Sequence, residues 1–386
     1  MSSSQIAVGR PAVVAAAGSE RAARTRDITA DILRGIGITG IVAIHLPLSA
    51  YQGKWFAVLL FFVVSGYLYR PAADWRGLGA WALRRTRSLL VPYTVFLAVT
   101  VAGWALVHAL RPGTGDLSSQ VSPRFATWAS LLLGGRALTG CLAIYWFITC
   151  LLVTQLAFAV LHLGVRNPLA RGAVLAGAYL LAHVESWRLS GPSMMVVPWS
   201  ADSALFTLPF YAAGFYGKAF IQRQTAGTRS VEVAAMLACA GLLAAESLGL
   251  MHYRLDVRGM HYHALLLDLL IPGAFLLAVV GASHALVPLG VGRGLAAVGS
   301  ASLAIMYLHL PLGKIVQGAL AALPGVPVPV SILVLAAVEL GVPLVLVRVV
   351  CSRSALLRFL LLGAPYRREE GAGSRKQGGR EGAVEI

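Results

Sequence analysis

Long apolar runs separated by short polar segments make up most of this sequence. Most of the runs reach or approach the ~20 residues that cross a hydrocarbon core of about 30 Å. The pattern therefore predicts an all-α, polytopic membrane protein with about ten transmembrane helices. The predicted helices cover residues 32–50, 55–70, 88–109, 141–164, 172–188, 203–219, 231–251, 264–286, 295–313 and 328–349.

The ends of the chain differ from this apolar middle. Residues 1–30 are rich in Ser, Ala and Arg, and their short apolar patch is followed directly by arginines. This order favours a flexible N-terminal segment kept in the cytoplasm over a cleaved signal peptide. Residues 351–386 become charged and glycine-rich, which predicts a disordered cytoplasmic tail. We expect a single transmembrane domain at 31–350, with a short interfacial or re-entrant helix near 125–135.

Basic residues predict which side of the membrane each loop faces. Ten spans put both termini on one side, and cationic loops are retained in the cytoplasm during insertion. If both termini are cytoplasmic, only eight of the 32 basic residues lie outside. This threefold excess on the inner side supports that orientation. The outer set is Lys54, Arg111, Arg124, Arg136, Arg188, Arg254, Arg258 and Lys314.

Composition excludes a soluble enzyme. Hydrophobic residues make up 58% of the chain and charged residues 12%, about half of the ~25% in ordinary soluble domains. The net charge of +16 lies mainly in the inner loops, where it would face the anionic inner leaflet, so nucleic-acid binding is not needed to explain it. The strong preference for Arg over Lys, with abundant Ala and Gly, is typical of a GC-rich bacterial gene. We therefore expect a multi-pass protein of the bacterial inner membrane.

The four cysteines and the acidic residues do not form the motifs of a metal site or a two-carboxylate active site. No cysteine lies in a CxxC pair or at metal-ligand spacing from a histidine, so we expect buried free thiols and no metal site. The acidic residues form no DxD or HExxH motif and no close carboxylate pair, which argues against a two-carboxylate hydrolase. The loop at 252–263 mixes polar and aromatic residues, as a sugar site or an ordinary interfacial loop would.

Of the histidines inside predicted spans, His45 and His309 are the best candidates for function. His45 follows the start of its helix by 13 residues and His309 by 14, so at about 1.5 Å per residue both lie ~20 Å into the membrane. Each is followed by Leu-Pro-Leu. A titratable group in hydrocarbon is costly and needs a partner, a cavity or a function. Either the two imidazoles only bridge helices, or burial keeps them neutral, which is the form that a general base needs.

Other candidate residues lie toward the predicted inner side. Arg34 precedes His45 by 11 residues, about three turns, so both project from a similar face. Ser65 and Gly66 form a small-residue step that lets another backbone or a ligand chain approach closely.

Arg84 and Arg87, three residues apart on one predicted helix face, would present two guanidiniums to one anion. Taken alone, the arginines are typical of topology anchors and the small-residue step is typical of helix packing.

In their order along the chain, these motifs resemble the membrane acyltransferase-3 family, integral acyl-transfer proteins that include many bacterial O-acetyltransferases. LRGI at 33–36 is followed by His45 with ten residues between Arg34 and the histidine. FFVVSGY at 61–67 and the Arg84/Arg87 pair before LLVPY come next. Weaker similarities lie at 145–147, 208–215 and 302–309.

The resemblance implies that His45 is the catalytic histidine and Arg34 its motif partner. It implies that Arg84 and Arg87 serve an acyl-CoA, such as acetyl-CoA, which acts as a co-substrate and not as a permanently bound cofactor. The pantetheine arm would pass the Ser65-Gly66 step.

We expect His45 to deprotonate an acceptor hydroxyl or to carry the acyl group itself. His309 is a weaker candidate, as an orienting partner or an acceptor-site group.

The predicted function is therefore an O-acyltransferase. It would move an acyl group, by expectation acetyl, to a hydroxyl of a sugar, glycolipid, polysaccharide or glycosylated metabolite. The alternative is a transporter or flippase for a small polar or lipid-linked substrate. That class favours inverted halves with matching broken helices, and the sequence contains no such symmetry.

Overall fold

Helices form nearly all of the regular secondary structure in this protein. The computed structural model describes residues 27–47, 55–110, 120–121, 126–189, 197–222, 226–262, 264–323, 325–351 and 353–364. Within these ranges the only β pairing is two isolated bridges, Val121–Leu138 and Asp256–His261. The predicted all-α class is confirmed for the described residues.

Each of the ten predicted runs coincides with a helix over most of its length. In chain order the helices are α2 (Ile28–His45), α3 (Ala57–Tyr67), α4 (Trp75–Leu110), α5 (Thr127–Leu133), η3 (Gly135–Ala137), η4 (Gly140–Leu142), α6 (Tyr145–Gly164), α7 (Pro168–Leu189), η5 (Pro198–Ser200), α8 (Ser203–Tyr216), α9 (Lys218–Gln222), α10 (Ala226–Ser247), α11 (Leu267–Leu286), α12 (Gly290–Ser300), α13 (Ser302–Ala321), α14 (Val328–Val345), the π-helical η6 (Leu346–Cys351) and α15 (Ala355–Leu362).

Seven stretches of the described chain are long and apolar enough to cross a membrane. α3 is equally apolar but has only 11 residues, and α7 and α8 are not among the seven. The protein is therefore a polytopic all-α membrane protein, while the count of ten spans and the cytoplasmic position of both termini stay predictions. The seven are Ile28–His45, Trp75–Leu110, Gly140–Gly164, Arg229–Ser247, Leu267–Leu286, Ser302–Ala321 and Val328–Cys351.

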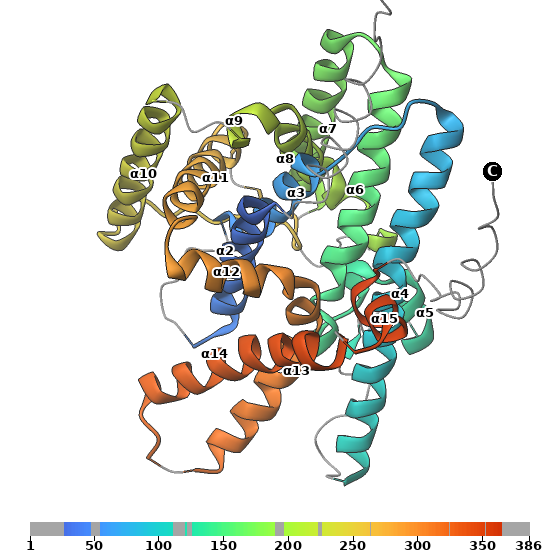
Figure 1. Ribbon diagram of the computed structural model, residues 1–386, viewed down its shortest axis with the longest axis vertical. Helices are drawn as coiled ribbons and strands as arrows, with labels where there is room; N and C mark the ends of the chain where they lie inside the picture. Colours follow the sequence, from blue (N-terminus) through green and yellow to red (C-terminus); the bar gives the residue numbers. More distant parts are fainter. Residues whose placement is uncertain are drawn as a thin grey trace, which may run out of the picture.

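The predicted helix at 295–313 is two helices, α12 and α13 (Figure 1). α12 crosses α2 at very short range. A side-chain carbon on Gly35 would overlap the backbone of Leu295, and one on Gly299 would overlap the backbone of Asp31. Because these glycines fix α12 across α2, the chain has to change direction before α13 begins.

The helix after α3 is also longer than predicted. α4 begins at Trp75, 13 residues before the predicted start at 88. At about 1.5 Å per residue its 36 residues extend about 54 Å, well beyond a hydrocarbon core of about 30 Å. The additional N-terminal turns carry Arg84, Arg85 and Arg87, so these arginines lie on a continuous helix.

A helix also lies inside the stretch predicted as a disordered tail. α15 begins after Ser354, whose hydroxyl accepts a hydrogen bond from the Leu357 N–H at 3.3 Å. It ends at Gly363, which adopts the left-handed conformation. Residues 353–364 therefore differ from the prediction, and the rest of the predicted tail lies outside the described residues.

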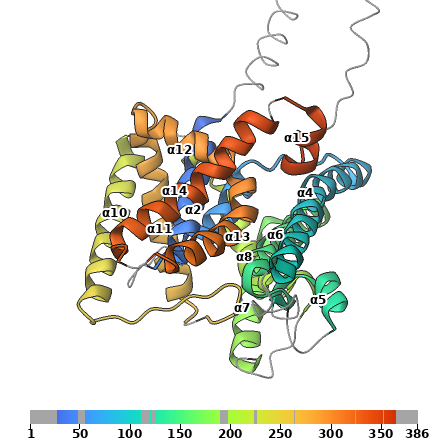
Figure 2. The same ribbon diagram turned by 90° about the horizontal axis from the view of Figure 1, so that it is seen from below.

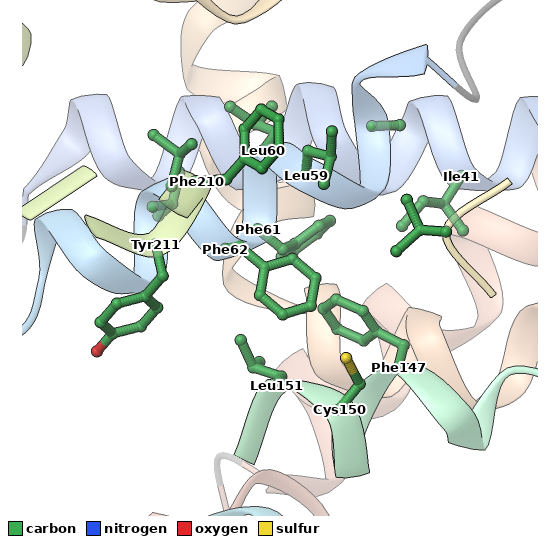
Figure 3. Packing of buried hydrophobic residues seen from close by; sticks show 14 of the residues in the cluster. Ile41, Leu59, Leu60, Phe61, Phe62, Phe147, Cys150, Leu151, Phe210 and Tyr211 are labelled. Carbon is green, nitrogen blue, oxygen red and sulfur yellow. The ribbon is translucent and has the colours of Figure 1, made fainter. Parts of the chain in front are cut away.

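α2 and α3 form the centre of the bundle, and α2 packs against α3, α11, α12, α13 and α14 (Figures 1 and 2). α3 is almost entirely buried, and its Phe61 and Phe62 pack edge-to-face against Phe147 of α6 (Figure 3). α3 and α8 approach closely at two glycines, since side-chain carbons on Gly66 and Gly214 would overlap backbone oxygens of the opposite helix. Small residues allow this approach, as is common between helices in membranes.

Candidate active site

His45 and His309 lie side by side. His45 is the last residue of α2 and occupies an exposed position, whereas His309 on α13 is 0% exposed. The centroids of the two imidazole rings are 5.3 Å apart, with an angle of 40° between the ring planes. The structure thus pairs a buried imidazole with one that a molecule outside the bundle can reach.

The surroundings of His309 define its hydrogen bonding. Its Nδ1 lies 2.9 Å from the carbonyl oxygen of Ile305 and 3.0 Å from that of Met306. Carbonyl oxygens only accept hydrogen bonds, so Nδ1 carries the proton. Nε2 is buried and has no hydrogen-bond partner among the described residues. Neutral His309 therefore keeps an unused lone pair on Nε2.

The sequence predicted that the two histidines lie at the same depth, because each follows the start of its predicted helix by a similar number of residues. In the structure His309 follows the start of α13 by only seven residues, because the predicted helix is divided into α12 and α13. The rings are nevertheless adjacent, since α13 packs directly against α2.

Two neighbouring cavities share Arg34, which lies 11 residues before His45 on α2, as a lining residue. We call the larger one, of about 510 Å³, the arginine cavity. The smaller one, of about 260 Å³, is the leucine cavity. Both are lined by Arg34, Ser65 and Arg85. The arginine cavity is also lined by Leu68, Tyr69, Arg70, Pro71, Ala72, Gly77, Trp81, Arg84, Gln155 and Tyr211.

Arg34 occupies the boundary between the two cavities. Its Nη1 lies 3.6 Å from Oδ1 of Asp31, one turn earlier on α2, and its side chain is 36% exposed. Together with Arg70, Arg84 and Arg85, it gives the arginine cavity four guanidiniums. Guanidiniums bind phosphates through charge-assisted, often bidentate hydrogen bonds. The cavity therefore has the chemistry to hold a polyanion.

The arginines of α4 divide differently from the predicted pair. Arg84 lines the arginine cavity, but Arg87 lines neither cavity and is exposed. Arg85, which the sequence analysis did not single out, lines both. Its Nε donates a hydrogen bond of 2.5 Å to Oε1 of Gln155 on α6. The RRTR sequence showed that three arginines were present, but only the rotation of α4 shows which one points inward.

Ser65 and Gly66 have separate roles. Ser65 lines both cavities, as expected for a residue beside a bound chain. Gly66 lines neither. A side-chain carbon there would overlap the carbonyl oxygen of Tyr211, so the glycine permits the close contact of α3 with α8. The structure supports the packing interpretation for Gly66.

The leucine cavity extends toward the histidines. Besides the shared residues it is lined by Phe61, Ser88, Leu89, Phe147, Ile148, Leu151, Gly299, Ser300, Ser302, Leu303, Met306, Leu362 and Gly363. Met306 is one helical turn from His309 and accepts its Nδ1–H. His45 itself lines neither cavity. Of these lining residues, Phe61 and Phe147 are in edge-to-face contact with each other, and Figure 3 shows the two rings.

Two cations of the predicted outer set, Lys314 and Arg258, lie close enough to His45 to act on it electrostatically. Arg258 is held by a 2.7 Å hydrogen bond from Nη2 to the carbonyl oxygen of Leu138. Burial lowers the pKa of its guanidinium. The His45 end of α2 thus has a positive electrostatic environment.

The loop that carries Arg258 is tied to the bundle by buried polar contacts. The Tyr253 hydroxyl donates to Asp268 on α11 at 2.8 Å, and His183 Nε2 lies 3.0 Å from the same carboxylate. His263, the last residue of the loop at 252–263, lies outside the described residues. Within those residues no three His, Cys, Asp or Glu side chains are grouped to hold a metal ion.

Comparison with known proteins gives one match. Neither the curated proteins nor the solved structures contain a match to this chain. A family model described as "Acyltransferase domain", the acyltransferase-3 model, matches residues 27–348. This span includes both histidines, Arg34, Ser65 and the arginines of α4. The match covers most of the chain, and the protein therefore belongs to the acyltransferase-3 family.

Proposed function

We propose that this protein is an O-acyltransferase of the bacterial cell membrane. It transfers an acyl group, by preference acetyl, from an acyl-CoA on the cytoplasmic side to a hydroxyl group. The acceptor is a sugar, glycolipid, polysaccharide or glycosylated metabolite. The observation that carries the proposal is the His45–His309 pair, positioned one helical turn beyond a cavity that Arg34 and Arg85 line.

Binding of the donor follows from the chemistry of the two cavities. The phosphates of CoA are anions, and Arg34, Arg84 and Arg85 offer them charge-assisted hydrogen bonds in the arginine cavity. The pantetheine arm is long, flexible and uncharged, with polar amides between apolar carbons, which suits a leucine cavity lined by both serines and apolar side chains. The arm then brings the thioester past Phe61, Phe147 and Met306 toward the histidines.

His45 acts as the general base. The acceptor reaches its exposed ring, which takes the hydroxyl proton while the oxygen attacks the thioester carbonyl carbon. The C–S bond then breaks, and the CoA thiolate leaves and receives the proton from the imidazolium. Such catalysis contributes about 10²- to 10⁴-fold in rate. His309 does not touch the acceptor in this scheme. It is a positioning residue whose ring lies against the catalytic one.

Family membership favours group transfer over the transporter alternative, and no feature of the described residues favours transport. The direct test incubates purified full-length protein, and separately membranes that supply native acceptors, with radiolabelled acetyl-CoA. Free CoA and labelled product are measured together. We expect both with wild type and both to form at least about 10²-fold more slowly with His45→Ala, although this variant should insert and melt normally. Full transfer activity in His45→Ala would overturn the mechanism, and no thioester cleavage with acceptor present would overturn the enzymatic function.

A further inference from the structure

The leucine cavity has a wall that lies outside the matched acyltransferase domain. The family match ends at residue 348, yet Leu362 and Gly363 line this cavity together with Arg34, Ser65 and Arg85. The segment that brings them there is α15, which follows the π-helical turn η6 and packs against α4, α13 and η6 (Figures 1 and 2). A part of the chain beyond the domain thus shapes the cavity that the domain encloses.

The end of α15 requires a glycine at position 363 for two independent reasons. Gly363 has φ +63, which favours glycine, and the N–H groups of Gly363 and Ala364 donate to the carbonyl oxygens of Phe359 (3.0 Å) and Arg358 (3.3 Å). In addition, a side-chain carbon on Gly363 would overlap the backbone of Ser88 on α4. Only glycine satisfies both the backbone conformation and the contact.

Ser88 connects this contact to the arginines. Its hydroxyl donates to the carbonyl oxygen of Arg85 at 2.9 Å, so Gly363 packs against the residue one turn after Arg85, whose side chain lines both cavities. Leu361 and Leu362 pack against the hydrophobic core, whereas Leu356 on the same helix is 51% exposed. α15 therefore presents one apolar side to the bundle and the cavity.

We propose that α15 is a structural part of the acyl-donor site and that Leu362 contacts the pantetheine arm of the bound acyl-CoA. This inference rests on the proposed function, which places that arm in the leucine cavity. Leu362 offers methyl groups to an uncharged chain, next to the guanidiniums that hold its phosphates. The C-terminal segment thus determines donor affinity although it lies outside the family domain.

The test compares two substitutions on the same helix, Leu362→Trp and Leu356→Trp. Both add the same bulk, but only residue 362 lines the cavity. Binding of tritiated acetyl-CoA to the full-length protein in detergent is measured by equilibrium dialysis, with thermal melting to check the fold. We expect the dissociation constant to rise at least tenfold for Leu362→Trp and to stay within twofold for Leu356→Trp. Equal dissociation constants for the two variants would overturn the inference, while acetyl-CoA that does not bind wild type would overturn the proposed function itself.

A second measurement serves if Leu362→Trp does not fold. The native cysteines within the described residues are all buried and unpaired, so Leu362→Cys and Leu356→Cys introduce distinct reactive thiols. We expect acetyl-CoA to slow maleimide labelling at residue 362 at least fivefold and to leave labelling at residue 356 unchanged. Unprotected labelling at 362, in a protein that binds acetyl-CoA, would contradict the proposed contact.

Discussion

The His309 imidazole on α13 lies against that of His45 at the end of α2, with 5.3 Å between the ring centroids. Of these two rings only that of His45 is exposed, so in the proposed reaction we expect the buried ring to act through the exposed one. Both nitrogens of His309 are buried, and its Nδ1–H is fixed by carbonyl oxygens of its own helix. We therefore expect substitutions of the two histidines to affect the proposed reaction to different extents.

Replacement of His45 by Ala should lower kcat about 10²- to 10⁴-fold, because the general base is lost. Replacement of His309 by Phe, which keeps the ring volume, should lower kcat less and leave the affinity for acetyl-CoA unchanged. The two effects should not add in the double variant, since His309 acts through His45. Initial rates with labelled acetyl-CoA measure all three variants. An additive double variant would show that His309 has a separate role.

Arg85 and Arg87 provide a matched pair on α4. Arg85→Gln removes a guanidinium that lines both cavities, whereas Arg87→Gln changes an arginine that lines neither. A hydrogen bond to a charged group contributes about 1.5–3 kcal/mol, so we expect acetyl-CoA to bind about 10- to 100-fold more weakly to Arg85→Gln. Arg87→Gln should bind within twofold of wild type. Equilibrium dialysis at two salt concentrations measures both, and the reverse order of effects would show that the predicted Arg84/Arg87 pair forms the anion site.

The contact between α3 and α8 predicts a steric effect. Gly66→Ala places a carbon where the carbonyl oxygen of Tyr211 lies, so the two helices must separate. Overpacking costs about 1–3 kcal/mol, and we expect a lower melting temperature and a poor yield. Gly79→Ala on α4 is the control, because nothing lies within 4 Å of its added carbon. It should melt at or slightly above the wild-type temperature, and an equally stable Gly66→Ala would refute this account of the contact.

Asp268 joins α7, α11 and the loop around Tyr253. Its carboxylate accepts from the Tyr253 hydroxyl and the Ala264 N–H, at 2.8 and 3.0 Å, and contacts His183 Nε2 at 3.0 Å. Both side chains of the His183–Asp268 pair are 0% exposed. Removing one partner of a buried charged network costs about 3–5 kcal/mol, so Asp268→Ala should lower the melting temperature sharply.

The exposed Asp74 at the start of α4 is the control for this prediction. Its Oδ1 accepts the Gly77 N–H at 2.6 Å, and asparagine caps a helix about as well as aspartate. Asp74→Asn should therefore melt close to the wild-type temperature. If Asp268→Ala had the same melting temperature as Asp74→Asn, the buried network around Asp268 would contribute little to stability.

The apolar runs alone determined the class of this protein and the location of nearly all its helices. A chain in lipid has to satisfy its backbone hydrogen bonds within each segment, so a long apolar run becomes a helix almost independently of its neighbours. The ordered motifs around Arg34, His45 and FFVVSGY also indicated the family, because they lie within single helices and keep their spacing in the sequence.

The tertiary structure decided what depends on contacts between helices. The glycines of α2 and α12 divide the predicted helix at 295–313, and the rotation of α4 turns Arg85 rather than Arg87 into the cavities. Leu362 reaches the same cavity from outside the family domain. The close approach of two helices and the rotation of a helix about its axis depend on the packing of residues far apart in the chain. The local periodicity of an apolar run therefore cannot predict them.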